Sequence, residues 1–232
     1  MKLAVMQPYF FPYLPYWQLM NAVDKYIVYD DVNYIKGGWI NRNRILINGK
    51  PAFFNLPVIG SSSYKLIGEV SCNLNAVKRR KMLTTLELAY KKAPQFNAVM
   101  PLIEKIILYE SEKIVPFLLN SFSIIGQYLD IDTEIILSST LPKDNSLKGK
   151  DKVLAICEYF GATEYFNAIG GVDMYSAEDF KARGINLKFL KSNPIKYKQF
   201  KNEFQSDLSI IDILMFCDIK SVKAFLLNYE LI

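Results

Sequence analysis

The start of this chain places two strand patterns and one helix pattern so close together that few folds can accommodate them. Leu3 to Met6 is a short apolar run that stops before Pro8, which is typical of a buried strand. Apolar side chains recur at helical spacing from Leu14 to Val23, and a proline is tolerated in the first turn of such a helix. Tyr26 to Tyr29 is β-branched and aromatic, as in a second strand. The sequence therefore predicts a compact parallel βαβ unit with a right-handed crossover.

A hairpin and a long helical region follow this unit. The Asn48-Gly49 dipeptide separates two strand patterns, from Arg44 to Ile47 and from Ala52 to Leu56, and predicts a tight turn. From Asn75 to about Leu129 the pattern is helical and punctuated by prolines. We expect this stretch to be an insert or cap on the sheet.

The alternation of strands and helices then returns. We expect strands at 134–137, 165–167 and 185–190, with helices at 153–160, 177–182, 208–216 and 222–227, the last two closing the chain. The predicted fold class is α/β, with an open, mostly parallel, Rossmann-like sheet, a β-hairpin and a helical insert. The expected organisation is a single domain over residues 1–232, with the insert at about 75–130.

Composition narrows the class of protein. Hydrophobic residues make up 51% of the chain, which is enough for a sizeable core. No apolar run approaches the ~20 residues that a membrane span needs, and the first apolar run meets Gln7-Pro8 too soon for a signal peptide. The three cysteines have no CxxC spacing, and the net charge of +5 suits an anionic ligand better than a nucleic acid. We expect a cytoplasmic protein.

The chain contains no histidine. Catalysis by a Ser-His-Asp or Cys-His arrangement is therefore excluded, as is a metal site built on histidine. Proton transfer, if there is any, falls to aspartate, glutamate, lysine or tyrosine.

The loop from Gln7 to Tyr13 follows the first predicted strand. Ligands of open α/β sheets bind outside the carboxyl ends of the strands, where the strand order reverses, and this loop leaves such an end and enters a helix. Its two prolines stiffen it, and its aromatic side chains offer stacking surfaces. The alternative is that Phe10, Phe11 and Tyr13 only cap the core; for Gln7 we favour a functional role.

Asp30 and Asp31 end the second predicted strand, beside the same crevice. Neighbouring residues of a strand point to opposite faces, so we expect one carboxylate to enter the site. That carboxylate could act as a base, bind Mg²⁺ or bind a sugar hydroxyl. The alternative is an ordinary turn at the end of a strand.

The segment from Tyr34 to Arg44 is dense in glycine, aromatic, amide and arginine side chains. Its Gly37-Gly38 pair allows a close approach of the backbone, and Arg42 and Arg44 could hold a phosphate or carboxylate. Strand alternation places Trp39, Asn41 and Asn43 on one face and the two arginines on the other.

Three later segments could line the same crevice. They are Ser138-Ser139-Thr140, Lys148-Gly149-Lys150 and Asn167-Ala168-Ile169-Gly170-Gly171, each after a predicted strand or before a helix. None matches a known phosphate-binding fingerprint, and such residues are equally typical of turns.

Together these segments resemble the WbqC-like protein family. The similarity is carried by MQPYFFPYLPYWQLMNAVDKYIVYDDVNYIKGGWINRNRILINGK, and then by YKKAP, GATEYFNAIGG, GINLKF, YKQF and LSIIDILMF. The resemblance implies a role in bacterial surface-polysaccharide synthesis, in particular the modification of amino sugars in O-antigen. The positions that match the family pattern are Gln7, Pro8, Tyr9, Pro12, Asp30, Asp31, Tyr34, Trp39, Asn41, Arg42, Arg44, Asn167, Gly170 and Gly171.

Three functions are compatible with these residues. The first is an enzyme that acts on a nucleotide-linked amino sugar, by the acyl or aminoacyl transfer that the resemblance implies, with Asp30 or Asp31 as a catalytic base or Mg²⁺ ligand. Its partners are the nucleotide sugar and an acyl or aminoacyl carrier. The second is a non-catalytic protein that binds the sugar nucleotide or the carrier. The third is single-stranded RNA binding, which the low overall charge disfavours.

Overall fold

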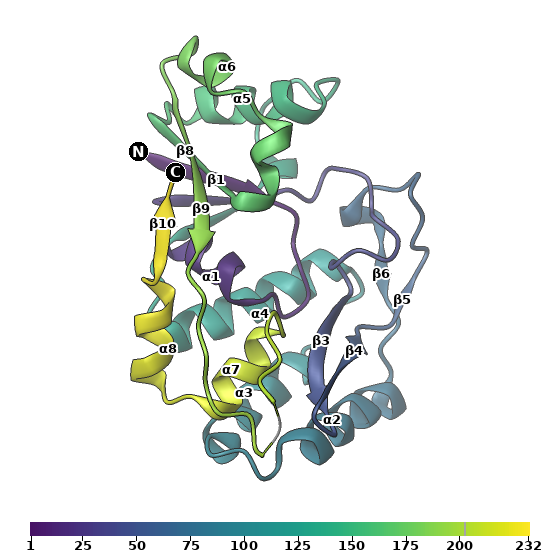
Figure 1. The fold of residues 1–232 in the computed structure, drawn as a ribbon. Helices are drawn as coiled ribbons and strands as arrows, with labels where there is room; N and C mark the ends of the chain where they lie inside the picture. The colour runs from purple at the N-terminus through teal and green to yellow at the C-terminus, as the bar shows by residue number, and fades with distance from the viewer. Residues whose placement is uncertain (202) are drawn as a thin grey trace.

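The computed structural model describes residues 1–201 and 203–232 and has a mixed α/β fold around a six-stranded sheet (Figure 1). The strands lie in the order β10-β9-β8-β1-β2-β7. Their bounds are Lys2–Met6 for β1, Lys25–Val28 for β2, Glu134–Leu137 for β7, Glu164–Ala168 for β8, Asn186–Ser192 for β9 and Tyr229–Leu231 for β10. All neighbours are parallel except β9 and β10, so the sheet is mostly parallel, as expected.

The helices lie close to the ranges that the sequence predicts. They are α1 Leu14–Asn21, α2 Ala76–Tyr90, α3 Phe96–Leu108, α4 Ile114–Leu129, α5 Gly149–Tyr159, α6 Ala177–Lys181, α7 Ile210–Phe216 and α8 Ile219–Leu226. Pro15 lies in the first turn of α1, where its missing N–H has no helical partner to lose. Pro101 lies inside α3, so this proline does not end the helix.

Side-chain alternation along the strands produces two cores, one on each face of the sheet. Leu3, Val5 and Ile27 face α5 and α6, in a cluster that includes Ile156 and Phe180. The intervening residues, such as Ala4, face a larger cluster that contains the buried faces of α1, α4, α7 and α8. Figure 1 shows α5 and α6 above the sheet and the larger helical layer below it. The period of two therefore fixes which layer each residue joins.

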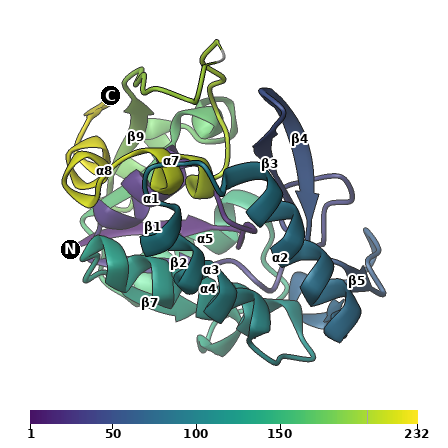
Figure 2. The ribbon, with the colours of Figure 1, turned by 90° about the horizontal axis from the view of Figure 1, so that it is seen from below.

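The connection between β2 and β7 carries two small antiparallel sheets and the three helices α2 to α4. The hairpin pairs β3 (Arg42–Ile47) with β4 (Lys50–Asn55), and β5 (Val58–Ile59) pairs with β6 (Ser71–Cys72). The hairpin turn has positive φ at Asn48 (51°) and Gly49 (76°), as the Asn-Gly signal predicts. Figure 2 shows α2 to α4 across the sheet, with the hairpin standing to one side.

Some elements differ from the prediction. The expectation that two helices close the chain is wrong, because β10 follows α8 and pairs with the edge of β9. The strands β5 and β6 are two residues each, too short to show an alternating pattern. The structure also contains three stretches of 3-10 helix, η1 (Ile67–Glu69), η2 (Ser138–Thr140) and η3 (Ile169–Met174), of which η2 and the start of η3 occupy segments with turn-like residues.

The strand order reverses beside β1. Chain order runs from β1 to β2 to β7 on one side, and from β8 to β9 to β10 on the other. The connections that leave the carboxyl ends of β1 and β8 therefore diverge and leave a crevice between them. The segments that follow these two strands are the Gln7–Tyr13 loop and η3.

Candidate functional site

The Gln7–Tyr13 loop is held in one conformation by side chains from distant parts of the chain. The amide of Asn43 in β3 donates to the carbonyl oxygens of Phe10 (3.1 Å) and Phe11 (2.9 Å). The hydroxyl of Ser209 also donates to the Phe11 carbonyl (2.8 Å). Phe11 has a φ of 43°, a left-handed conformation that is rare for a bulky residue. These bonds maintain a backbone that the local sequence alone disfavours.

The aromatic residues of this loop divide between the two roles that the sequence left open. Phe10 and Phe11 are fully buried in the larger core, as the capping alternative has it. Tyr9 and Tyr13 remain partly exposed and line a cavity. Burial raises the pKa of both tyrosines, which keeps their hydroxyls neutral and able to donate a hydrogen bond at pH 7.

A cavity of about 590 Å³ lies at the crevice where the strand order reverses. Seven of the predicted site residues line it: Gln7, Tyr9, Trp39, Arg44, Asn167, Gly170 and Gly171. Three segments far apart in sequence supply these residues: the loop after β1, the stretch from Trp39 to Arg44 that enters β3, and the segment from β8 into η3. The structure therefore brings together half of the predicted set at the expected edge of the sheet.

Arg44 is a cation that lines this cavity, and its guanidinium N–H groups are not all hydrogen-bonded. One of its terminal nitrogens, Nη2, donates to the backbone oxygen of Asp207 (3.0 Å), and its guanidinium lies 5.8 Å from the Trp39 ring. Its Nε–H is buried and has no hydrogen-bond partner among the described residues. The guanidinium donates to one backbone oxygen, so its remaining N–H groups could pair with an anionic or oxygen-rich ligand in the cavity.

The predicted alternation around Arg42 and Arg44 is wrong for Trp39. The strand begins only at Arg42, so a period of two does not extend back to Trp39, which lies beside Arg44. Within the strand, Asn43 is buried between the half-buried Arg42 and Arg44, as alternation predicts. Arg42 stacks on the Phe53 ring (4.3 Å) and donates to the Gly38 oxygen (3.1 Å), outside the cavity lining.

Four other predicted site residues brace the loops instead of lining the cavity. The Tyr34 hydroxyl donates to Asn41 (2.6 Å), whose amide donates to the Leu56 backbone oxygen (3.0 Å). Pro12 accepts bonds from the indole of Trp17 (3.0 Å) and from the backbone of α7, while Pro8 is buried. The hydrogen bonds of Tyr34, Asn41 and Pro12 therefore maintain the geometry of the loops.

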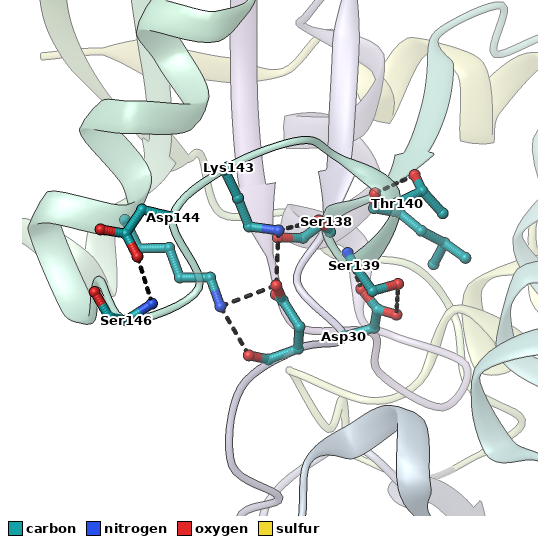
Figure 3. A network of polar contacts seen from close by, with 10 residues as sticks. Asp30, Ser138, Ser139, Thr140, Lys143, Asp144 and Ser146 are labelled. Atoms are coloured by element: carbon teal, nitrogen blue, oxygen red, sulfur yellow. Dashed lines mark hydrogen bonds and ion pairs between the residues drawn. The ribbon is translucent and has the colours of Figure 1, made fainter.

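Asp30 contacts the segment that follows β7 (Figure 3), and Asp31 contacts the same segment through Lys143. The Asp30 carboxylate accepts from the backbone N–H (2.9 Å) and the hydroxyl (2.6 Å) of Ser139. Asp31 forms ion pairs with Lys143 (2.8 Å) and Lys152 (2.9 Å), whose side chains are almost fully buried. Neither aspartate is among the residues that line the cavity. Alternation does not separate them, because β2 already ends at Val28.

The environment of Asp31 keeps it ionised. Burial alone would raise the pKa of Asp31, but its contacts with Lys143 and Lys152 outweigh burial and hold the pKa below its usual value. The assignment of Asp30 and Asp31 as catalytic groups stays a prediction. Their observed contacts hold the segment after β7 against the ends of the strands.

The model of the WbqC-like protein family matches residues 7–224. The chain belongs to this family. This WbqC-like protein is 27% identical over 217 residues to the uncharacterized protein Rv1507c of Mycobacterium tuberculosis, a match that covers 92% of each chain. No solved structure matches it.

The WbqC-like chain offers no acidic cluster for Mg²⁺ among the residues that the structure describes. No group of three or more histidine, cysteine, aspartate or glutamate side chains is close enough there to hold a metal ion. Asp30 and Asp31, one of which the sequence offers as an alternative Mg²⁺ ligand, already have their carboxylates bonded to Ser139 and to two lysines. These contacts do not fit a magnesium site.

A reactive thiol is also disfavoured in this WbqC-like protein. Burial raises the pKa of Cys72 to about 11, and it raises the pKa of Cys157 to about 12. A thiol with such a pKa is protonated at pH 7 and is a poor nucleophile.

In the described part of the chain, no helix is both long and apolar enough to cross a membrane.

Sequence reasoning missed several residues of the cavity. Tyr16, Tyr29, Met174, Tyr175 and Asp207 join its lining. Tyr29 ends the second predicted strand, so its position was a usable signal. The sequence around Asp207 contains no pattern that indicates a site. Asp207 reaches the cavity because Ser209, two residues later, forms a β-bridge with Tyr13 and donates its N–H to the Arg44 oxygen.

Proposed function

We propose that this cavity binds a nucleotide-linked amino sugar, and that the protein is an enzyme of bacterial surface-polysaccharide (O-antigen) biosynthesis in the cytoplasm. The observation that carries the proposal is Arg44, a guanidinium that donates to one backbone oxygen, in a cavity walled by aromatic rings. A diphosphate supplies acceptors for the guanidinium, and the rings supply surfaces for a base or sugar. Membership of the WbqC-like family supports the biosynthetic context.

The dimensions and chemistry of the cavity suit such a ligand. Its volume of about 590 Å³ lies within the range of cavities that hold small molecules. Trp39 lies at the rim of the cavity and is 39% exposed. The ring centroids of Tyr9 and Tyr16 are 5.4 Å apart, and the two rings are tilted relative to each other. Rings that are fixed by packing but open on one face are suited to stacking on a ligand.

The position of the cavity supports phosphate binding. The strand order corresponds to the 3-2-1-4-5-6 order of Rossmann-like sheets, in which dinucleotides bind at the reversal point. Gly149, the first residue of the eleven-residue helix α5, also lines the cavity, so the N-terminus of a helix faces it. Backbone N–H groups there favour an anion.

The proposed reaction is transfer of an acyl or aminoacyl group from a carrier to the amine of the sugar. Asp30 or Asp31 remains the proposed base on sequence grounds. Neither aspartate lines the cavity, and Asp31 is paired with Lys143, which favours a second candidate, a protein that binds the sugar nucleotide without catalysis. Turnover of a bound amino sugar with an acyl donor would separate the enzyme from the binding protein.

Arg44 and Arg42 form a matched pair for testing the binding site. Both stand on β3, but only Arg44 lines the cavity. We expect Arg44→Ala to weaken the binding of UDP- or dTDP-sugars about tenfold or more, because a charge-assisted bond is lost. Arg42→Ala should bind within about twofold of the parent. Calorimetric titration measures both; equal losses in the two variants, or no binding by the parent protein, would contradict the proposal.

A further inference from the structure

A second cavity of about 570 Å³ adjoins the first. It is lined chiefly by apolar side chains, among them Leu14, Pro194, Ile195, Phe204 and Ile213. Tyr13 and Asp207 line both cavities and so form a wall between them. The first cavity is thus one half of a larger, two-part site.

Asp207 is held firmly at this wall. Its φ of 55° is a left-handed conformation, and its backbone oxygen accepts a bond from Arg44 Nη2 (3.0 Å). Two residues on, the Ser209 N–H donates to the Arg44 oxygen (2.8 Å), and Ser209 pairs with Tyr13. The carboxylate accepts a hydrogen bond from Ser206 (2.7 Å), and the residue as a whole is exposed.

The charges of the two cavities are arranged around this wall. Among the described lining residues of both cavities, Asp207 is the one carboxylate, while Arg44 lies in the first cavity and Lys196 in the second. Arg44 and Asp207 are in direct contact through the guanidinium and the backbone oxygen. A phosphate and a cationic group separated by one sugar ring could therefore reach both residues.

We propose that Asp207 binds the ammonium group of the amino sugar held in the first cavity, and that the second cavity receives an uncharged acyl group attached to that nitrogen. The inference rests on the proposed function and adds a determinant of substrate class. An ammonium group gains a charge-assisted bond to Asp207, whereas an acylated nitrogen is neutral. The acyl chain then gains contact with the apolar lining of the second cavity.

The first experiment measures selectivity for the amine. UDP, UDP-glucose and UDP-hexosamines that carry the amine at each ring position in turn are titrated calorimetrically. We expect at least one amino sugar to bind the parent protein about tenfold more tightly than UDP-glucose. Asp207→Asn should abolish this preference, because asparagine tolerates the same positive φ but carries no charge. Glu203→Gln, an exposed carboxylate of the same segment outside both linings, should retain it.

The second experiment tests the adjoining cavity with the N-butanoyl derivative of the preferred hexosamine. We expect Ile195→Trp, which fills the second cavity, to weaken binding of this derivative about tenfold while the free amine binds as before. Ile195→Leu, which conserves volume, should bind both ligands as the parent does. Equal affinities of Ile195→Trp and parent for the derivative would overturn the assignment of this cavity.

The two proposals fail in different ways. If neither UDP nor any UDP-sugar binds, the proposed function fails together with the inference. If UDP-sugars bind through Arg44 but every amine binds no better than UDP-glucose, or if Asp207→Asn keeps the preference, only the role of Asp207 is overturned.

Discussion

Gly170 and Gly171 are adjacent residues of η3 with opposite tolerance for a side chain. A Cβ added at Gly171 would lie 2.6 Å from the amide nitrogen of Asn167, whereas a Cβ at Gly170 would meet nothing within 4 Å. Asn167 cannot move away easily, because it is buried and its side-chain oxygen accepts the Ala168 N–H (2.8 Å). The close approach of η3 to the end of β8 therefore depends on one glycine and not on its neighbour.

Gly171→Ala should consequently lower the free energy of unfolding by about 1–3 kcal/mol, as overpacking typically does. It should also weaken ligand binding, since Asn167 lines the cavity. Gly170→Ala is the matched control and should change stability by less than about 0.5 kcal/mol. Urea denaturation of both variants checks the pair, and similar losses in the two would refute the steric explanation.

At the scale of an element, the Gln7–Tyr13 loop is shaped by residues outside it. Asn43 and Ser209 both donate to the Phe11 carbonyl oxygen, from β3 and from the start of α7. Because Tyr9 and Tyr13 of this loop line the cavity, the same bonds that stabilise the strained Phe11 also orient the candidate site.

Removal of either donor should therefore affect stability and binding together. We expect Asn43→Ala to lower the free energy of unfolding by about 1–3 kcal/mol, since buried carbonyl groups lose their partner. Ser209→Ala should cost less, and the double variant should deviate from additivity because both side chains share one acceptor. A double-mutant cycle by urea denaturation measures the coupling, and strict additivity would argue against shared support of Phe11.

The segment after β7 is a second such element, fastened by Asp31. Asp31→Asn leaves Lys143 and Lys152 buried without a counter-charge, so we expect a loss of about 3 kcal/mol at pH 7. Asp179→Asn, which breaks an exposed pair with Lys150, should have little effect. The folded pKa of Asp31 is lowered, so its contribution is complete above its unfolded value of 3.8 and is lost as the pH falls through the folded value.

Stability curves of the parent and Asp31→Asn between neutral and acidic pH check this direction. Their difference should shrink below about pH 4. Activity adds a further distinction: a catalytic Asp31 would lose turnover while the protein stays stable at pH 7. A stable, inactive Asp31→Asn variant would favour the catalytic prediction over the structural role.

At the scale of the whole molecule, Asp212 joins regions that are far apart in the chain. Its buried carboxylate accepts hydrogen bonds from Tyr90 at the end of α2 (2.9 Å), from Tyr197 (2.7 Å) and from Gln199 (2.6 Å). The Tyr90 hydroxyl in turn accepts the Leu46 N–H of β3 (2.9 Å). The helical layer, the hairpin and the segment before α7 thus meet at one buried group.

Burial raises the pKa of Asp212 above 3.8, although its three donors oppose the shift. The folded protein then binds the proton more tightly than the unfolded chain does. The two limits are the pKa of Asp212 in the unfolded chain and its higher pKa in the folded protein. Between them the stability of the fold rises as the pH falls, opposite to the trend for Asp31. We expect the difference in unfolding free energy between the parent and Asp212→Asn to move in favour of the parent from pH 7 towards pH 4. A difference in unfolding free energy between the two proteins that does not change with pH would contradict this expectation.

Much of the fold could be predicted from local patterns. Apart from β5 and β6, the order of helices and strands from Lys2 to Leu226 follows from side-chain periodicity and turn chemistry, as do the Asn48-Gly49 turn and the mostly parallel sheet. The short strands β5, β6 and β10 could not, because a few residues carry no period and pair only when a partner edge is present.

The candidate site divides in the same way. The sequence by itself predicted a site after β1 that includes Gln7, Tyr9 and Arg44, and these residues do line one cavity, since strand ends and residue type are local properties. Only the tertiary structure decided the rest. It placed Trp39 beside Arg44, turned Asp31 towards two buried lysines and brought Asp207 to the wall between two cavities. These positions depend on contacts between distant segments, which no local pattern encodes.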